Sequence, residues 1–192
     1  MWNSMTDSPL VLSLADLPRA AGSVRDRSVE WAAPADLGTP SMGVEEGTPI
    51  PVGVELTSID DGVLVRLTTA VDLVGECVRC LDPVRVHHDV SSAEVYVEPG
   101  SAAAAEADGG PGADALNEIG PRDTIDIEPQ LRDAIVTLVD PRPLCSSDCA
   151  GLCDVCGEKW VDLPADHEHV VIDPRLASLA SLLGESAEPG RS

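Results

Sequence analysis

The chain has 192 residues, of which 34 are Asp or Glu and 12 are Lys or Arg, so its formal net charge is −22 at pH 7. Direct RNA contact over a broad surface is not expected, because non-specific affinity for phosphates comes from clustered cations. Aromatic residues make up 2% of the chain and Phe is absent, so an aliphatic core is expected. The chain shows neither a membrane-spanning apolar run nor a secretory leader. We therefore expect a cytoplasmic protein with no membrane association, whose acidic surface suits basic partners.

The first half of the chain predicts a small antiparallel sheet. Segment 1–51 is expected to hold one strand within Leu10–Leu17, followed by an extended stretch rich in Pro and Gly. Residues 52–98 alternate as half-buried strands do, and Asp60-Asp61-Gly62 is a hairpin turn between two of them. The three expected strands are Val52–Ser58, Val63–Val74 and Val84–Val97.

The second half predicts a packed helix and a Cys/His segment. Residues 99–120 are rich in Ala, Gly and acidic residues and are expected to form a flexible loop. In 121–183, apolar residues recur at helical spacing from Ile127 to Leu138, and a short apolar helix is expected over Pro174–Leu183. A disordered tail, 184–192, follows. The predicted fold class is α+β: a small antiparallel sheet with one amphipathic helix and a C-terminal zinc-binding segment.

Eight sulfur and imidazole groups stand at metal-ligand spacing. They are Cys77-x2-Cys80, Cys145-x3-Cys149-x3-Cys153-x2-Cys156 and His167-x-His169. In a reducing compartment such pairs indicate metal or redox chemistry rather than disulfides. A Cys-x-x-Cys turn lets two thiolates reach one ion, and zinc takes four such ligands. The sequence therefore predicts structural zinc, as one or two ions.

Two pairings of these ligands remain open. In the first, one site uses Cys77, Cys80, Cys145 and Cys149, and the other uses Cys153, Cys156, His167 and His169. In the second, a single site uses Cys145, Cys149, Cys153 and Cys156, which leaves Cys77 and Cys80 as a free dithiol. A third interpretation is that the thiols are structural and bind no metal.

The pattern does not favour an enzyme. Reactive Cys-x-x-Cys thiols are usually activated at a helix N-terminus, whereas Cys77 and Cys80 follow a predicted strand. His87 and His88 lie in a strand, where neighbouring side chains point to opposite faces, so surface positions are expected for both. The chain also lacks a phosphate-binding glycine loop and a serine-nucleophile motif.

Four blocks of the sequence, in order, resemble the signatures of the YceD family. The resemblance extends from Leu10 to about Leu183. The blocks are Gly75–Pro83, Asp126–Asp133, Pro143–Gly157 and Ile172–Leu179.

This resemblance implies a bacterial or plastid protein needed for normal accumulation of large-subunit ribosomal RNA, in a family with no demonstrated enzyme activity. By position, all six cysteines match the family's cysteines, whereas His167 and His169 stand where many relatives have a further cysteine pair. The leading hypothesis is a non-catalytic ribosome-biogenesis factor that binds a ribosomal protein or a large-subunit assembly intermediate. The alternative is a zinc-stabilised acidic adaptor or regulator of the transcription machinery.

Overall fold

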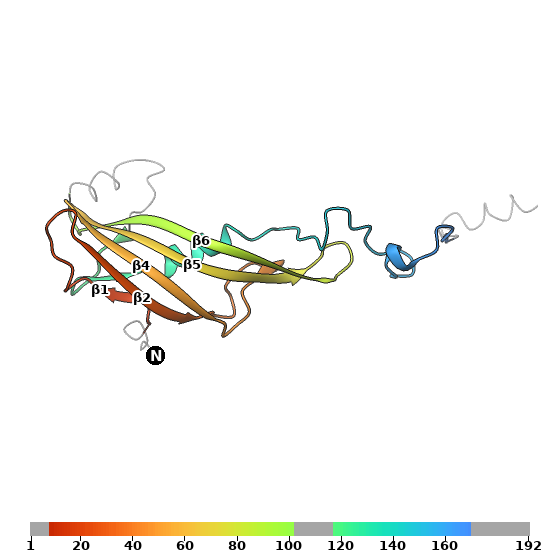
Figure 1. Ribbon diagram of the computed structural model, residues 1–192, viewed down its shortest axis with the longest axis horizontal. Coiled ribbons are helices and arrows are strands. Elements are labelled where there is room, and N and C mark those ends of the chain that lie inside the picture. The colour runs from red at the N-terminus through yellow and green to blue at the C-terminus, as the bar shows by residue number, and fades with distance from the viewer. Residues whose placement is uncertain (1–7, 102–116, 170–192) are drawn as a thin grey trace, which may run out of the picture. The chain divides into compact units, whose positions relative to one another are not determined.

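The computed structural model describes residues 8–101 and 117–169, and the chain divides into two units, 1–147 and 148–192. The first unit contains the main sheet. Its strands are β2 (Val24–Ala32), β3 (Met42–Gly43), β4 (Pro49–Ile59), β5 (Gly62–Glu76), β6 (Pro83–Val97) and β7 (Asn117–Glu118). Their order is β2-β4-β5-β6-β7, with β3 beside β5. The four long strands run side by side and are antiparallel to their neighbours (Figure 1).

The sheet buries one face. In β4 every second side chain is buried, and the residues between them are exposed or half-buried. β5 repeats this alternation over most of its length, as expected of strands with one face against a core. The core side chains of these two strands are aliphatic, namely Ile50, Val52, Val54, Leu56, Val63, Val65, Leu67, Val71 and Leu73.

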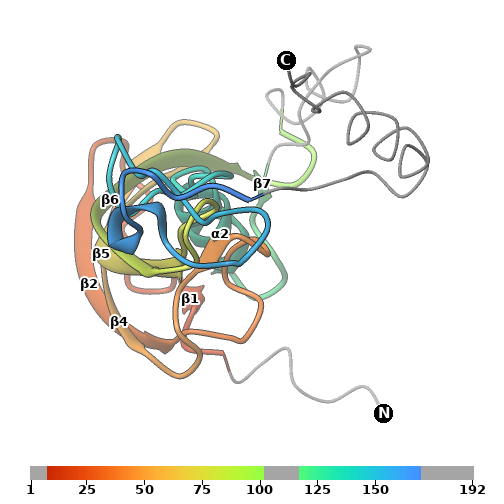
Figure 2. The same ribbon diagram turned by 90° about the vertical axis from the view of Figure 1, so that its right-hand side faces the viewer.

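Two small elements cover the buried face. β1 (Val11–Ser13) pairs with β8 (Thr124–Asp126) as a separate two-stranded sheet, and the helix α2 (Glu128–Val136) follows β8 directly. Figure 2 shows α2 and β1 within the curve of the main sheet. Leu131 and Ile135 of α2 are fully buried, so the helix closes the core.

A buried glutamine ties α2 to the sheet. Gln130 is 1% exposed, and its Nε2 donates to Val65 O at 3.2 Å and to Ser92 Oγ at 3.1 Å. The Tyr96 hydroxyl donates to Asp126 O at 3.1 Å and lies 3.4 Å from Gln130 Oε1. Burial raises the pKa of Tyr96 well above its ordinary value. These bonds satisfy polar groups that would be costly to bury alone.

The predicted fold class is confirmed, and so are the strand near the N-terminus, the three central strands and the helix after Ile127. The stretch before Pro51, which was expected only to be extended, contains β2 and β3. Alternation is hard to recognise in β2, since Arg25 and Arg27 occupy two of the positions that face the same way as the buried Trp31.

Parts of the other predictions lie outside the described residues. These are positions 102–116 of the expected loop, the expected helix Pro174–Leu183 and the tail 184–192. The described end of the loop contains β7. Among the described residues, no helix is long and apolar enough to cross a membrane.

Replacing Gln130 with alanine should lower the free energy of unfolding by about 2–4 kcal/mol, because it leaves a cavity and removes the buried hydrogen bonds. Urea denaturation would measure this change. Val136→Ala is the matched control, since Val136 lies on the same helix and is 37% exposed. An equal effect of the two substitutions would contradict the role of the buried network.

Candidate metal centres

The first Cys-x-x-Cys motif forms the turn between β5 and β6. Cys77 N donates to Asp82 O at 2.7 Å, and Leu81 N donates to Cys77 O at 2.9 Å. Leu81 has φ of 62°, in the left-handed region that glycine favours, and its side chain is largely exposed. The Cys77 and Cys80 side chains are buried. The ladder of the β5–β6 hairpin thus ends in two thiols held by one tight turn.

A third thiol reaches this turn from the segment after α2. Val78 N donates to Pro143 O at 3.0 Å, which fixes that segment against the turn. Cys145 Sγ lies 3.4 Å from Cys80 Sγ. The sulfur atoms of Cys77, Cys80 and Cys145 all lie within 4.8 Å of one another. Residues 65 positions apart in the sequence therefore share one cluster.

The backbone around this cluster favours the thiolate form. Burial alone would raise the pKa of Cys77, but hydrogen bonds from the N–H of Cys145 and of two residues in the turn lower that pKa to about 6. Thiolate is the form that binds metal. The turn is thus shaped to present a charged sulfur.

The second Cys-x-x-Cys motif, in the second unit, repeats the same turn. Cys153 N donates to Glu158 O at 2.8 Å, and Gly157 N donates to Cys153 O at 2.9 Å. Gly157 has φ of 76° and stands where the first motif has Leu81. The N–H groups of Cys156 and Val155 lower the pKa of Cys153 to about 6, against the opposing effect of burial.

Two histidines complete the second cluster. The short helix η1 (Trp160–Asp162) precedes a turn in which His167 N donates to Pro164 O at 3.0 Å. His167 Nε2 lies 3.6 Å from Cys156 Sγ. His169 Nε2 is buried and has no hydrogen-bond partner among the described residues. Together with Cys153, these side chains offer four ligand atoms within 4.8 Å of one another.

The donor sets of both clusters fit a soft or borderline metal ion. Zinc binds thiolate at ~2.3 Å and imidazole at ~2.0–2.1 Å in tetrahedral geometry, which requires donor atoms about 3.3–3.8 Å apart. Donors within 4.8 Å of one another need only small movements to meet one ion. An imidazole nitrogen that is buried without a partner, as in His169, is also the group that a metal would satisfy.

Cys149 is the first cysteine of the second unit and is buried. Its role as fourth ligand of the first site stays a prediction from the sequence. The structure groups Cys153 and Cys156 with the two histidines, as the two-site pairing has it.

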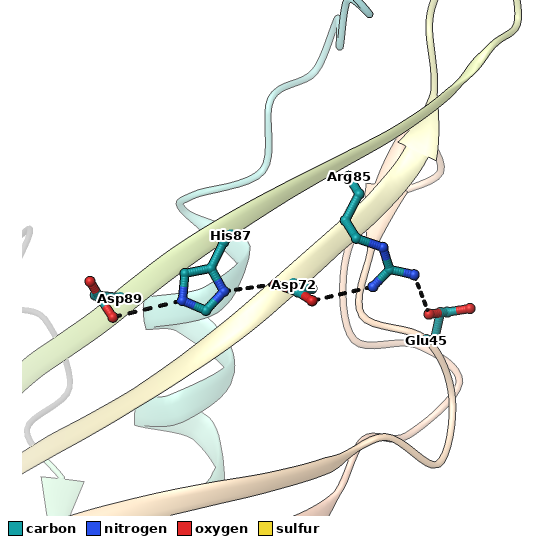
Figure 3. Close-up of polar contacts among 5 residues, drawn as sticks. All are labelled: Glu45, Asp72, Arg85, His87 and Asp89. Carbon is teal, nitrogen blue, oxygen red and sulfur yellow. Dashed lines mark hydrogen bonds and ion pairs between the residues drawn. The ribbon is translucent and has the colours of Figure 1, made fainter.

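A surface network lies on β5, β6 and the segment before β4, outside both clusters (Figure 3). Arg85 pairs with Glu45 at 2.8 Å and with Asp72 at 3.3 Å. His87 Nδ1 lies 2.7 Å from Asp72 Oδ1, and its Nε2 lies 3.9 Å from Asp89 Oδ1. The hydrogen bond with His87 is the main reason that the pKa of Asp72 is lowered. All five side chains are well exposed, so these pairs contribute little stability. His87 is thus a surface residue, as expected.

Sequence reasoning missed the role of Leu81. A signal was present, because both motifs read Cys-x-x-Cys followed by one residue and then an acid, Leu81-Asp82 in one and Gly157-Glu158 in the other. The missing glycine concealed the equivalence of the two turns.

The fold and the clusters define a class of protein: a one-sided antiparallel sheet whose chain carries two Cys-x-x-Cys turns of the metal-binding type. The chain belongs to the family described as large ribosomal RNA subunit accumulation protein YceD, which matches residues 65–183.

Similar proteins occur in mycobacteria. Uncharacterized proteins of Mycobacterium bovis and Mycobacterium tuberculosis are 33% identical over 181 residues, which cover 94% of this chain and 84% of each relative. An uncharacterized protein of Mycobacterium leprae is 33% identical over 176 residues, or 92% of this chain and 78% of the relative. No solved structure matches the chain.

Substitutions at the left-handed position of the two turns should change metal affinity in opposite directions. Leu81→Gly removes a strained conformation and should strengthen metal binding at the first turn, whereas Gly157→Ala should weaken it at the second, each by about 1 kcal/mol or fivefold. A Cβ added at Gly157 would meet no atom within 4 Å, so only the backbone conformation opposes the substitution.

Competition with a chromophoric chelator would measure both affinities. Val155→Ala, at an exposed position of the second turn, serves as the control and should change neither. A loss of affinity in Leu81→Gly would contradict the equivalence of the turns.

Proposed function

We propose that the chain binds two structural zinc ions and acts as a non-catalytic factor in the biogenesis of the large ribosomal subunit. The observation that carries the zinc proposal is the clustering of Cys153, Cys156, His167 and His169, four donors of the types that zinc prefers. The family's description, which names accumulation of large-subunit ribosomal RNA, carries the biological part.

The first zinc site takes Cys149 as its fourth ligand in this proposal. Cys149 lies four positions after Cys145, so their Cα atoms can be at most about 14 Å apart. The three clustered thiols of the first unit supply the other ligands. These four thiolates make up the first site of the two-site pairing.

The absence of catalysis at the zinc ions is part of the proposal and follows from the number of ligands. A catalytic zinc keeps one coordination position for water or substrate, whereas a structural zinc has four protein ligands. Eight protein donors for two ions leave no such position. In this proposal zinc maintains the fold, and function depends on the surfaces that the fold presents.

A basic protein is the partner that the charge favours. With a formal net charge of −22, the surface attracts ribosomal proteins and repels bare RNA phosphates. We therefore propose contact with a ribosomal protein, free or within an assembly intermediate of the large subunit, in the cytoplasm.

Elemental analysis of the native protein should find about two zinc ions per chain. Substituting His167 and His169 with alanine should reduce this to about one, because the second site loses two of four ligands. His87→Ala and His88→Ala together form the control and should retain both ions. A chain that holds no zinc when purified without chelators would overturn the metal proposal.

Affinity purification of the tagged chain from cells should recover precursors of the large ribosomal subunit. Depletion of the chain should lower mature large-subunit RNA relative to small-subunit RNA, because assembly intermediates that lack a factor are degraded. Recovery of RNA polymerase without ribosomal particles would contradict this function.

A further inference from the structure

β6 forms an edge of the main sheet over most of its length. β5 pairs with all of β6, whereas β7 pairs only with Tyr96 and Val97. Among the described residues, no backbone hydrogen bond joins residues 84–95 to anything but β5. A long strand edge with unpaired peptide groups is a template for another strand.

The register identifies which peptide groups face outward. Val97 O accepts from Ile119 N at 2.9 Å on the β7 side, whereas Glu98 N donates to Asp61 O at 2.9 Å on the β5 side. Residues of an antiparallel strand alternate in this respect, and the register with β5 is continuous from Pro83 to Val97. The outward-facing N–H and C=O groups are therefore those of Arg85, His87, Asp89, Ser91, Ala93 and Val95.

A groove of about 460 Å³ follows this edge. Residues 89–92 line it consecutively, together with Glu94. Because neighbouring residues of a strand point to opposite faces, a groove lined by consecutive residues runs along the edge itself. Its other wall is formed by Asp133 and Ala134 of α2 and by Thr137 and Leu138, which follow the helix. An extended peptide fits such a site.

The groove is acidic. Asp89, Glu94 and Asp133 line it, and no Lys or Arg does. The α2 helix ends at Val136 beside it, and the negative end of the helix dipole adds to the negative potential. Asn117 Nδ2 donates to Glu94 Oε2 at 2.5 Å, which satisfies one oxygen of one carboxylate.

We propose that the β6 edge binds an extended, lysine- or arginine-containing segment of a partner protein as an added strand. The outward peptide groups of residues 89–93 form the ladder with it, and the carboxylates of Glu94 and Asp133 hold its basic side chains. This inference rests on the proposed function in that it locates the surface for the basic partner.

Two other occupants fit the edge less well. The chain's own residues 102–116 precede β7, but they carry Glu106, Asp108 and Asp114 and no basic residue, so their charge matches that of the groove. RNA would bring phosphates against three carboxylates, and the outward peptide groups offer it no strand ladder.

The backbone part of the proposal is tested with a fluorescent peptide of ~10 residues, a strand length, in which lysine and valine alternate. Ser91→Pro removes one outward N–H without touching the β5 ladder and should weaken peptide binding about tenfold, the equivalent of one or two hydrogen bonds. Ser91→Ala keeps the N–H and should bind normally. The same peptide with alternate N-methylated amides should not bind. Equal binding by both Ser91 variants, each confirmed folded by circular dichroism, would overturn the proposal.

The role of the groove carboxylates is tested with two double variants that remove the same number of charges. Glu94→Gln with Asp133→Asn should weaken binding roughly tenfold at low salt. Asp26→Asn with Glu30→Gln makes the same change of charge at exposed positions of β2 and should have little effect. If both pairs weaken binding equally, net charge alone attracts the peptide and the groove is not the site.

Recovery of ribosomal precursors distinguishes failure of the proposed docking edge from failure of the proposed function. If the native chain recovers ribosomal precursors and Ser91→Pro recovers them equally well, the edge is not the docking surface and the proposed function stands. If the native chain recovers none, the proposed function fails, and the peptide measurements alone decide whether the edge binds basic strands.

Discussion

The backbone ladder between β5 and β6 is the interaction on which the first Cys-x-x-Cys turn and the β6 edge both depend. It joins the two strands without interruption from Gly62 and Val97 to Glu76 and Pro83. At one end, the ladder closes into the Cys77–Cys80 turn. Along its length it determines which β6 peptide groups face outward. A slip of one residue would invert every side chain and would remove both features together.

Close packing within this hairpin fixes the register. A Cβ at Gly62 would lie 2.1 Å from Tyr96 O, so only glycine fits where the two strands begin to pair. On the buried face of the sheet, Gln130 of α2 donates to the Val65 carbonyl of β5 and to the Ser92 hydroxyl of β6. The helix therefore recognises the paired strands through their polar atoms, and a shifted register would leave Gln130 buried without partners.

The second unit has a different source of stability. Among its described residues, only Cys149, Gly151 and Cys153 are buried, so it has almost no apolar core. A segment of this kind cannot offset its conformational entropy by hydrophobic burial. Metal coordination can do so, as in small zinc modules that are unfolded without their ion. The metal would thus contribute most where packing contributes least.

The sequence predicts the parts of this structure that depend on local pattern. Alternation locates β4, β5 and β6, and ligand spacing identifies the cysteines and histidines. β2 is hard to recognise because Arg25 and Arg27 stand at positions that face the same way as the buried Trp31. Arg27 bonds to Ser13 O and to Asp16 near the N-terminus. The left-handed backbone conformation of Leu81 could not be predicted, because leucine rarely adopts it. The groove could not be predicted, because no local pattern says which strand lies at the edge.

Metal coordination leaves the acidic character of the chain intact. A zinc ion with two thiolates and two imidazoles is neutral, and one with four thiolates carries two negative charges, so neither proposed site would offer a cation to phosphate. The carboxylates of the β6 groove act in the same direction. The proposed zinc sites and the β6 groove thus both disfavour bare RNA. A basic protein bound along the β6 edge is the means by which such a chain would join a ribonucleoprotein particle.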